Sequence, residues 1–334
     1  MLFRIAYLME DTDLSGGVRV QLAQTDALVA RGHAVTIFTK GLPLTWRTSA
    51  AEWEYVDDFG VPSYEGFDFV VATFWTTVRP AWERAGARTV HLSQGLESTF
   101  TAYDDAREEI EAVYRLPIPK MVVSPHLVEW LAPFGSEVVS VGQIVDDAFF
   151  RPRRGAEHDP LRVLLPGAAQ IDFKGVDVGY GAALHARANG ATFDLVRVSP
   201  WAPAPDEPHE SAAEFHVGLD ARAMAALIHS CDIVVGPSRK EEGFGLPPAE
   251  AMAAGIPAVL TKIPSFLAFD PQRRDYALWA GGDDPIALGE ELVRLLDDED
   301  LRESLGARGR EVAEQWRAGL VAERIEAFLA RRRR

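Results

Sequence analysis

Short apolar runs alternate with helical patterns along the whole chain, and this alternation is the feature that most restricts the fold. Parallel strands need a crossover connection, usually a helix, so the pattern is typical of parallel α/β architecture. Two sets of about six strands are expected, the first beginning near Phe3 and the second near Arg162. The 334 residues suit two domains of roughly 150 residues each. We therefore expect an α/β protein with two doubly wound parallel sheets.

The expected strands are short, apolar and bounded by turn residues. In the first half of the chain they are Phe3–Met9, Val35–Phe38, Phe69–Ala72, Thr89–Leu92, Met121–Val123 and Val138–Val141. In the second half they are Arg162–Leu165, Phe193–Val198, Phe215–Val217, Ile233–Gly236, Ala258–Leu260 and Ala277–Trp279. The helices expected between them include Val18–Arg31, Val176–Ala188, Ala221–His229 and Ile286–Leu296.

The polar segment 146–159 lacks periodicity and is the natural boundary between the two domains. We expect an N-terminal domain over residues 1–150, a second domain over 151–315 and a C-terminal helical segment over 316–334. Ligands of open α/β sheets bind outside the carboxyl ends of the strands. A cleft between the two domains is therefore the expected active site.

Composition excludes several classes of protein. The net charge of −16 argues against a nucleic-acid partner, because phosphate neutralisation needs a basic surface. The single cysteine, Cys231, precludes an internal disulfide and is expected to be a buried structural thiol. No apolar run reaches the roughly 18 residues that a membrane span needs, and the first residues read as a strand, so a cytoplasmic protein is expected. Arg331–Arg334 are expected to form a solvated tail, or a weak contact with anionic lipid at the inner membrane face.

The segment 237–257 is the most informative one for function. It reads as a polar loop with Gly243 and Gly245, followed by a helix that opens with two prolines. The glycines let a ligand approach the main chain, and the N–H groups at the helix start favour an anion. Two carboxylates, Glu242 and Glu250, bracket this site. Taken singly, Glu250 would only favour the helix dipole and Glu242 would be a solvated loop charge.

Two other loops follow predicted strands and precede helices. Gly16 and Gly17 come after the first strand and suit main-chain contact with a diphosphate or a sugar, although glycine pairs also serve tight turns alone. This loop is not the GxGxxG fingerprint, which disfavours a nicotinamide enzyme. Lys174 follows the first strand of the second half, where it can place a point charge on a diphosphate or simply remain solvated.

Two histidines accompany the strands of the first half. His91 follows an apolar strand, and strand ends at the cleft are where catalytic groups sit. A structural histidine within the strand is the alternative. His126 begins a helix and is the weaker candidate.

The block from Glu242 to Gly255, with Pro237-Ser238 before it and Glu250 within it, resembles the glutamate–seven–glutamate signature of glycosyltransferase family 4. These are retaining glycosyltransferases of the GT-B class, with two facing Rossmann-like domains. Weaker likenesses extend over nearly the whole chain, and those at residues 112–152 are nearest to bacterial deoxysugar (rhamnosyl) transferases. The resemblance implies that the helix at 316–334 crosses back to the first domain.

The resemblance also implies roles for individual residues. Glu250 would accept hydrogen bonds from the ribose hydroxyls of a nucleotide, and Glu242 with the main chain of Gly243, Phe244, Gly245 and Leu246 would hold the sugar. Lys174, Gly16 and Gly17 would stabilise the leaving diphosphate, His91 would contact the donor sugar, and Ser238 would belong to the donor-binding loop. In the family the departing phosphate acts as the base. No cofactor and no metal are expected, because helix N-termini, glycine N–H groups and Lys174 would offset the charge of the diphosphate.

The chain departs from the family pattern at one place. An arginine that precedes the Lys-Gly pair in the family is replaced here by Ala168 and Ala169. Gln170 or Arg239 is expected to compensate as a donor. The expected partners are a nucleotide-sugar donor and a glycan, lipid-linked or small-molecule acceptor. The alternatives are a nucleotide-sugar epimerase, a glycan phosphorylase or a sugar-nucleotide-binding protein without turnover.

Overall fold

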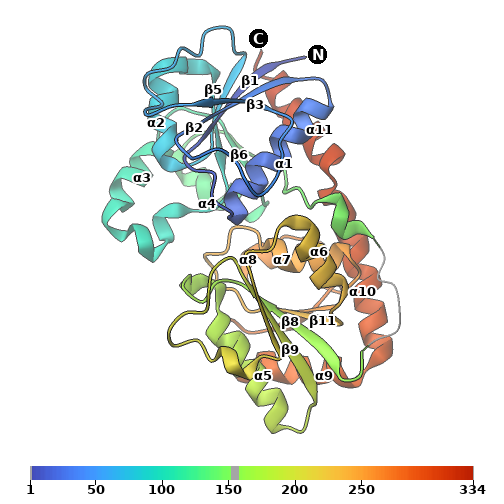
Figure 1. Ribbon diagram of the computed structural model, residues 1–334. Helices are drawn as coiled ribbons and strands as arrows, with labels where there is room; N and C mark the ends of the chain where they lie inside the picture. The colour runs from blue at the N-terminus through green and yellow to red at the C-terminus, as the bar shows by residue number, and fades with distance from the viewer. Residues whose placement is uncertain (1, 152–157, 334) are drawn as a thin grey trace. The chain divides into compact units, whose positions relative to one another are not determined.

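The computed structural model describes residues 2–151 and 158–333 and divides the chain into two compact units (Figure 1). Unit 1 comprises Met1–Ile144 and Ala318–Arg334, and unit 2 comprises Val145–Arg317. We expected the domains to divide after residue 150 and the last segment to begin at 316, and the units divide near both positions. Residues 152–157 of the expected connector and Arg334 lie outside the described residues.

Unit 1 is built on a parallel sheet of seven strands in the order β3-β2-β1-β4-β5-β6-β7. The strand β1 pairs in parallel with both β2 and β4, so the strand order reverses direction beside β1. The strands are β1 (Arg4–Met9), β2 (Ala34–Thr39), β3 (Glu52–Tyr55), β4 (Phe69–Ala72), β5 (Thr89–Ser93), β6 (Lys120–Val122) and β7 (Val138–Ser140).

The helices of unit 1 lie on both faces of this sheet (Figure 1). Successive residues of β1 point to opposite faces. Ala6 and Leu8 pack in one apolar cluster with Val78 of helix α2, whereas the hydroxyl of Tyr7 donates to Gln24 of helix α1 at 3.4 Å. The helices are α1 (Gly16–Ala30), α2 (Trp75–Ala85), α3 (Arg107–Tyr114), α4 (His126–Leu131) and α11 (Ala318–Ala330).

Helix α11 is the last element of the chain and packs beside α1 within unit 1 (Figure 1). Its Glu326 binds Arg31 at 2.6 Å and His33 at 2.7 Å. After the helix, Arg332 pairs with Glu137, and Arg333 pairs with Asp68 at 3.0 Å. The expectation of a solvated arginine tail is therefore wrong for these two residues, because carboxylates of unit 1 hold both guanidinium groups.

Unit 2 contains a parallel sheet of six strands in the order β10-β9-β8-β11-β12-β13. Counted from β8, this is the order 3-2-1-4-5-6 of dinucleotide-binding folds, and the order reverses between β8 and β11. The strands are β8 (Leu161–Pro166), β9 (Phe193–Ser199), β10 (Glu214–Val217), β11 (Ile233–Gly236), β12 (Ala258–Thr261) and β13 (Leu278–Ala280).

The core of unit 2 forms where α5 and α9 pack together against the sheet (Figure 1). Fully buried Ala182, Ala186, Leu288 and Leu292 fill that contact, and small alanines let the two helices approach closely. The helices are α5 (Val176–Ala188), α6 (Ala221–His229), α7 (Leu246–Ala253), α8 (Pro264–Leu267), α9 (Pro285–Asp297) and α10 (Glu299–Ala313). Within the described residues, no helix combines the length and apolar character of a membrane span.

Candidate active site

Two loops meet where the strand order of unit 2 reverses. The loop after β8 carries Lys174, and the loop after the adjacent strand β11 carries Ser238 and Glu242. The Lys174 ammonium binds Oε2 of Glu242 at 2.7 Å, and the Ser238 hydroxyl donates to the same oxygen at 3.1 Å. Because adjacent parallel strands end at the same edge of a sheet, residues 68 positions apart become partners. We did not predict this pair from the sequence.

Glycine at position 175 allows this close approach of the two loops. Gly175 has φ +60°, and a Cβ there would lie 2.1 Å from the carbonyl oxygen of Pro237. Any side chain would therefore push the loop after β8 away from the loop after β11. The Arg239 N–H also donates to the carbonyl of Phe173 at 2.7 Å, which ties the same two loops together.

The glycine loop before helix α7 is held from behind by aromatic rings. Gly245 has φ +90°, and a Cβ at this position would meet the ring of Phe266 at 2.3 Å. The ring of Phe244 packs 5.1 Å from that of Phe269 and 5.3 Å from that of Trp316. These contacts fix the main chain just ahead of α7, where Leu246 is the first helical residue and the next two, Pro247 and Pro248, have no N–H.

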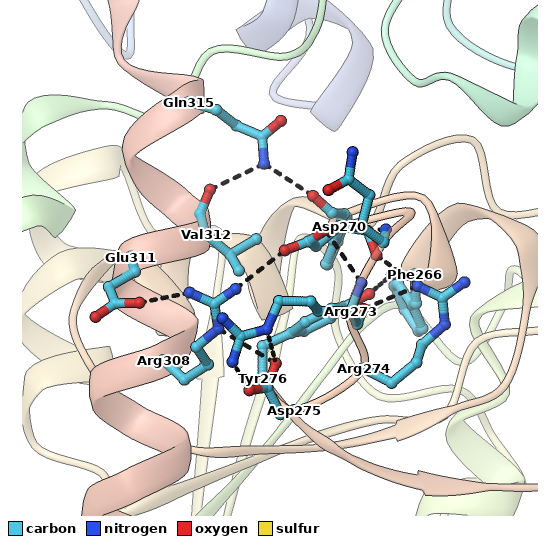
Figure 2. Close-up of polar contacts among 12 residues, drawn as sticks. Phe266, Asp270, Arg273, Arg274, Asp275, Tyr276, Arg308, Glu311, Val312 and Gln315 are labelled. Atoms are coloured by element: carbon cyan, nitrogen blue, oxygen red, sulfur yellow. Dashed lines mark hydrogen bonds and ion pairs between the residues drawn. The ribbon is translucent and has the colours of Figure 1, made fainter.

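A network of charged residues holds the segment 266–276, which carries the rings of Phe266 and Phe269. Figure 2 shows Arg308 of α10 reaching Asp270 at 3.1 Å and Asp275 at 3.2 Å, across the loop that follows α8. The side-chain amide of Gln315 donates to the carbonyl of Phe269 at 2.8 Å. The hydroxyl of Tyr276 donates to the carbonyl of Phe266 at 2.7 Å. Helix α10 and the residues after it thus hold in place the aromatic residues that pack against the glycine loop.

The second carboxylate of the signature lies in the middle of α7. Glu250 has no exposed surface, while Glu242 is 6% exposed. The two side chains therefore differ in access: Glu242 lies beside Lys174 at the end of the sheet, and Glu250 is enclosed. A contact between Glu250 and any ligand requires a shift of the surrounding residues.

The two residues expected to replace the family arginine are held elsewhere. The side-chain amide of Gln170 donates to the carbonyl of Ala202 at 2.8 Å. The guanidinium of Arg239 binds Asp283 at 2.7 Å and Asp177 at 2.9 Å, and it also donates to the carbonyl of Asp172. In this structure both side chains brace loops, and their expected role as phosphate donors remains a prediction.

A buried ion pair, not predicted from the sequence, lies next to the loop after β8. Arg197 of β9 and Glu207 are both buried, and Nη2 of the arginine lies 2.6 Å from the carboxylate. The guanidinium also donates to the carbonyls of Leu165 at 2.5 Å and Gly167 at 2.9 Å. The pair therefore holds the main chain at the carboxyl end of β8 in place. An arginine inside an otherwise apolar strand was the available signal, because buried charges are rare unless paired.

Of the two glycines expected to contact the donor, Gly17 borders a pocket of about 280 Å³ in unit 1, and Gly16 does not line it. Helix α1 begins at Gly16, and the Ser15 hydroxyl caps it by accepting from the N–H of Val18 at 3.2 Å. Gly17 lines the pocket, together with residues that follow β4 and β5. Gln94 donates to the carbonyl of Gly17 at 3.3 Å.

His91 lies inside strand β5 rather than at its end, which corrects the placement expected from the sequence. Its ring is fully buried, stacks 5.9 Å from Tyr114, and finds no hydrogen-bond partner for either nitrogen among the described residues. Burial and the nearby Lys120 ammonium lower the pKa of His91 to about 3. The ring is therefore neutral at physiological pH, and the structural alternative fits this position. His126 bonds to the Ser124 hydroxyl at 2.8 Å.

Cys231 is fully buried, and burial raises the pKa of its thiol to about 12, so the expected structural thiol is confirmed. Across residues 2–151 and 158–333, no group of three or more His, Cys, Asp or Glu side chains is arranged to hold a metal ion.

Part of the second unit is similar to a known family. Residues 209–312 match the family described as glycosyl transferases group 1, a segment from just before β10 to within α10. The phosphatidyl-myo-inositol mannosyltransferase of Mycobacterium leprae is 34% identical over 107 residues, which cover 32% of this chain and 28% of that protein. The MMP alpha-(1->4)-mannosyltransferase of Mycolicibacterium hassiacum is 30% identical over 197 residues, 54% of this chain and 44% of that protein. The matched part thus spans less than half of either relative.

A solved structure extends the likeness to both units. HepE of Anabaena, in complex with UDP-glucose, superposes with a TM-score of 0.78 at 13% identity, covering 98% of this chain and all of that one. At this identity the likeness concerns the fold. The expected α/β fold of the GT-B type, with two Rossmann-like parallel sheets, is confirmed.

Proposed function

We propose that this protein is a retaining glycosyltransferase that moves a sugar from a nucleotide-diphosphate sugar to an acceptor hydroxyl. The observation that best supports this proposal is the Lys174–Glu242 pair. It lies where the strand order of unit 2 reverses, beside the glycine loop that precedes α7. A lysine, a carboxylate and the main-chain N–H groups of the glycine loop at one sheet edge suit a ligand with both a diphosphate and hydroxyls. The group 1 match over residues 209–312 supports the same proposal.

In this proposal, different residues of unit 2 bind different parts of the nucleotide sugar. Lys174 leaves Glu242 and binds the diphosphate, which supplies a stronger negative charge. Glu242 and Ser238 then accept and donate hydrogen bonds to the sugar hydroxyls, with the main chain of Gly243 to Leu246. Glu250 binds the ribose hydroxyls once the neighbouring residues shift.

The transfer itself exchanges one bond for another at the anomeric carbon. The bond from that carbon to the diphosphate oxygen breaks, and the acceptor oxygen forms its bond on the same face of the ring. The acceptor proton passes to the departing phosphate oxygen, so the nucleoside diphosphate leaves with the electron pair. Lys174 stabilises the developing charge on the diphosphate. The roles that the resemblance implies for Gly16 and Gly17 remain predictions. We propose that no metal is required.

The test begins with the nucleotide. A thermal-shift screen with UDP, GDP, dTDP and ADP identifies the base, because a ligand at about 100 times its Kd stabilises by about 2.7 kcal/mol. The matching nucleotide sugars are then offered with an acceptor panel, with and without EDTA, and NMR assigns the anomer of the product. Inversion at the anomeric carbon, or loss of activity in EDTA, contradicts the corresponding part of the proposal.

Glu242→Gln is the variant that tests the site. It should lower turnover by about 10²–10³-fold, the size found when one group that stabilises a transition state is removed. Nucleoside diphosphate affinity should change little, because the partner of Glu242 is the sugar. Glu241→Gln next to it is the matched control and should behave as the parent. Nucleotide binding without transfer by the parent itself would favour a binding protein over an enzyme, and reversible isomerisation of the sugar would favour an epimerase.

A further inference from the structure

The pocket of unit 1 lies at the carboxyl ends of β1, β4 and β5, where the strand order of its sheet reverses. Its volume of about 280 Å³ is at the lower limit for small-molecule sites, which suits a single sugar ring. The loop after β1 and the N-terminus of α1 form one side of it, and the turn after β5 forms another. The walls of the pocket therefore come from loops at one edge of a single sheet.

Three carboxylates line this pocket: Glu10, Asp11 and Glu97. None of the described residues that line it is a lysine or an arginine. Glu10 is already engaged, since it binds Lys40 at 3.0 Å and accepts from the Thr76 hydroxyl at 2.6 Å. Asp11 is exposed, and its Oδ1 accepts from the nearby Asp13 N–H at 3.1 Å. The lining therefore presents acceptors and negative charge to a ligand.

Glu97 is the buried member of the three. It is 4% exposed, its carboxylate accepts from the Tyr114 hydroxyl, and its N–H donates back to the same hydroxyl oxygen at 2.9 Å. Burial raises the pKa of Glu97 to about 7. Near neutral pH this side chain can donate or accept a hydrogen bond, as a ligand hydroxyl also can.

Aromatic rings form the remaining wall. Phe74, Phe100 and Tyr103 line the pocket, with ring centroids 6.0 Å apart for Phe74 and Tyr103 and 6.2 Å apart for Phe100 and Tyr103. Aromatic faces pack against the C–H faces of a sugar ring, while carboxylates bind its hydroxyls. Gln21 and Gln94 add amide groups that both donate and accept.

We infer that this pocket binds the acceptor as a single hydroxyl-rich sugar ring without negative charge, and that it rejects the phosphorylated form of the same ring. The inference rests on the proposed function, because the bound sugar is taken as the acceptor of the transfer. A phosphate group inside the pocket would meet carboxylates with no lining cation to compensate, and like charges at short range repel strongly. An amino sugar would bind at least as well as the neutral one.

Ligand-observed NMR on the full chain tests this directly, with glucose, glucosamine and glucose 6-phosphate as probes. We expect binding of the first two and at least about tenfold weaker binding of the phosphate. Equal binding of glucose and glucose 6-phosphate overturns the inference, and so does the absence of binding by glucose and glucosamine.

The double variant Asp11→Asn/Glu97→Gln tests the cause of the discrimination. It keeps the shape of the pocket and removes the charge of Asp11 and the partial charge of Glu97, so the preference for glucose over its phosphate should fall to within about threefold. The matched control, Glu54→Gln/Glu65→Gln, removes two charges from exposed positions of unit 1 that do not line the pocket. An equal loss of preference in the control would show a general charge effect and overturn the inference. Thermal melts confirm that both variants fold.

Nucleoside diphosphate binding, measured on the same samples, separates this inference from the proposed function. Nucleotide binding together with unselective sugar binding contradicts only the inference. Selective sugar binding without any nucleotide binding contradicts the transfer, and with it the assignment of the pocket to an acceptor.

Discussion

The first loop of each sheet, after β1 in unit 1 and after β8 in unit 2, occupies the same topological place but has a different electrostatic setting. In unit 2 the loop is surrounded by ion pairs: Arg197–Glu207 beneath it, Arg239 with its aspartates beside it, and Lys174–Glu242 at its end. In unit 1 the loop borders a pocket lined by carboxylates and aromatic rings. In our proposal, one fold thus provides a place for an anion in one unit and for an uncharged ring in the other.

The difference shows how a shared sheet topology is divided between two ligands. Strand order fixes where a ligand binds, since both sites lie beside the reversal of the order. The charges of a few side chains then decide what binds there. If this account is right, removing charge from unit 2 should be costly, and removing a polar group from the core of unit 1 should cost little.

The largest expected effect comes from breaking the buried ion pair. Glu207→Leu leaves the Arg197 guanidinium buried without its carboxylate, which should cost about 3–5 kcal/mol of unfolding free energy. Urea denaturation followed by tryptophan fluorescence measures the loss.

The double variant Arg197→Met/Glu207→Leu is the control, because replacing both charges by apolar groups is often neutral in stability. It should recover most of the stability yet bind nucleotide more weakly, since the end of β8 loses its hydrogen bonds to the guanidinium. A Glu207→Leu variant as stable as the parent, or a double variant with unchanged nucleotide affinity, would show that the pair does not position the loop.

The smallest effect is expected from His91→Phe in unit 1. Phenylalanine fills the same space beside Tyr114, and no hydrogen bond to a described residue is lost. Stability at pH 7 should therefore change by less than about 1 kcal/mol.

The dependence of the unfolding free energy on pH, below neutral pH, is the clearer test of the role of His91. Folding lowers the pKa of His91 from 6.5 to about 3, so between these values the unfolded chain binds the extra proton. The parent should lose stability as pH falls through that window, and His91→Phe should lose less. A large drop in turnover with unchanged melting temperature would instead support the donor-sugar contact predicted from the sequence.

Much of the fold was predictable because buried parallel strands are continuous apolar runs. All twelve expected strands are present with small shifts at their ends. The strand β3 was missed because its sequence, Glu52–Tyr55, is largely exposed at the sheet edge and alternates charge with aromatic residues. An edge strand of this kind lacks the apolar signal on which the prediction depended.

The site was predictable in part. The loop before α7 was predictable from its glycines and prolines. At Gly245, for example, the positive φ and the nearby ring of Phe266 leave no room for a side chain. The Lys174–Glu242 pair was not predictable without the strand order, which alone brings residues so distant in sequence together. Arg239 and Gln170 were assigned to phosphate by residue type, and their carboxylate and carbonyl partners could be found only in three dimensions.

The measurement that tests the central claim most directly is the affinity of Glu250→Gln for the nucleoside diphosphate, by calorimetry. A hydrogen bond to a charged group contributes about 1.5–3 kcal/mol, so losing the carboxylate should weaken binding by about 10- to 150-fold. Glu290→Gln, an exposed position of α9, is the control and should bind as the parent does. A folded Glu250→Gln variant that binds nucleotide as tightly as the parent would contradict the assignment of the nucleotide to unit 2.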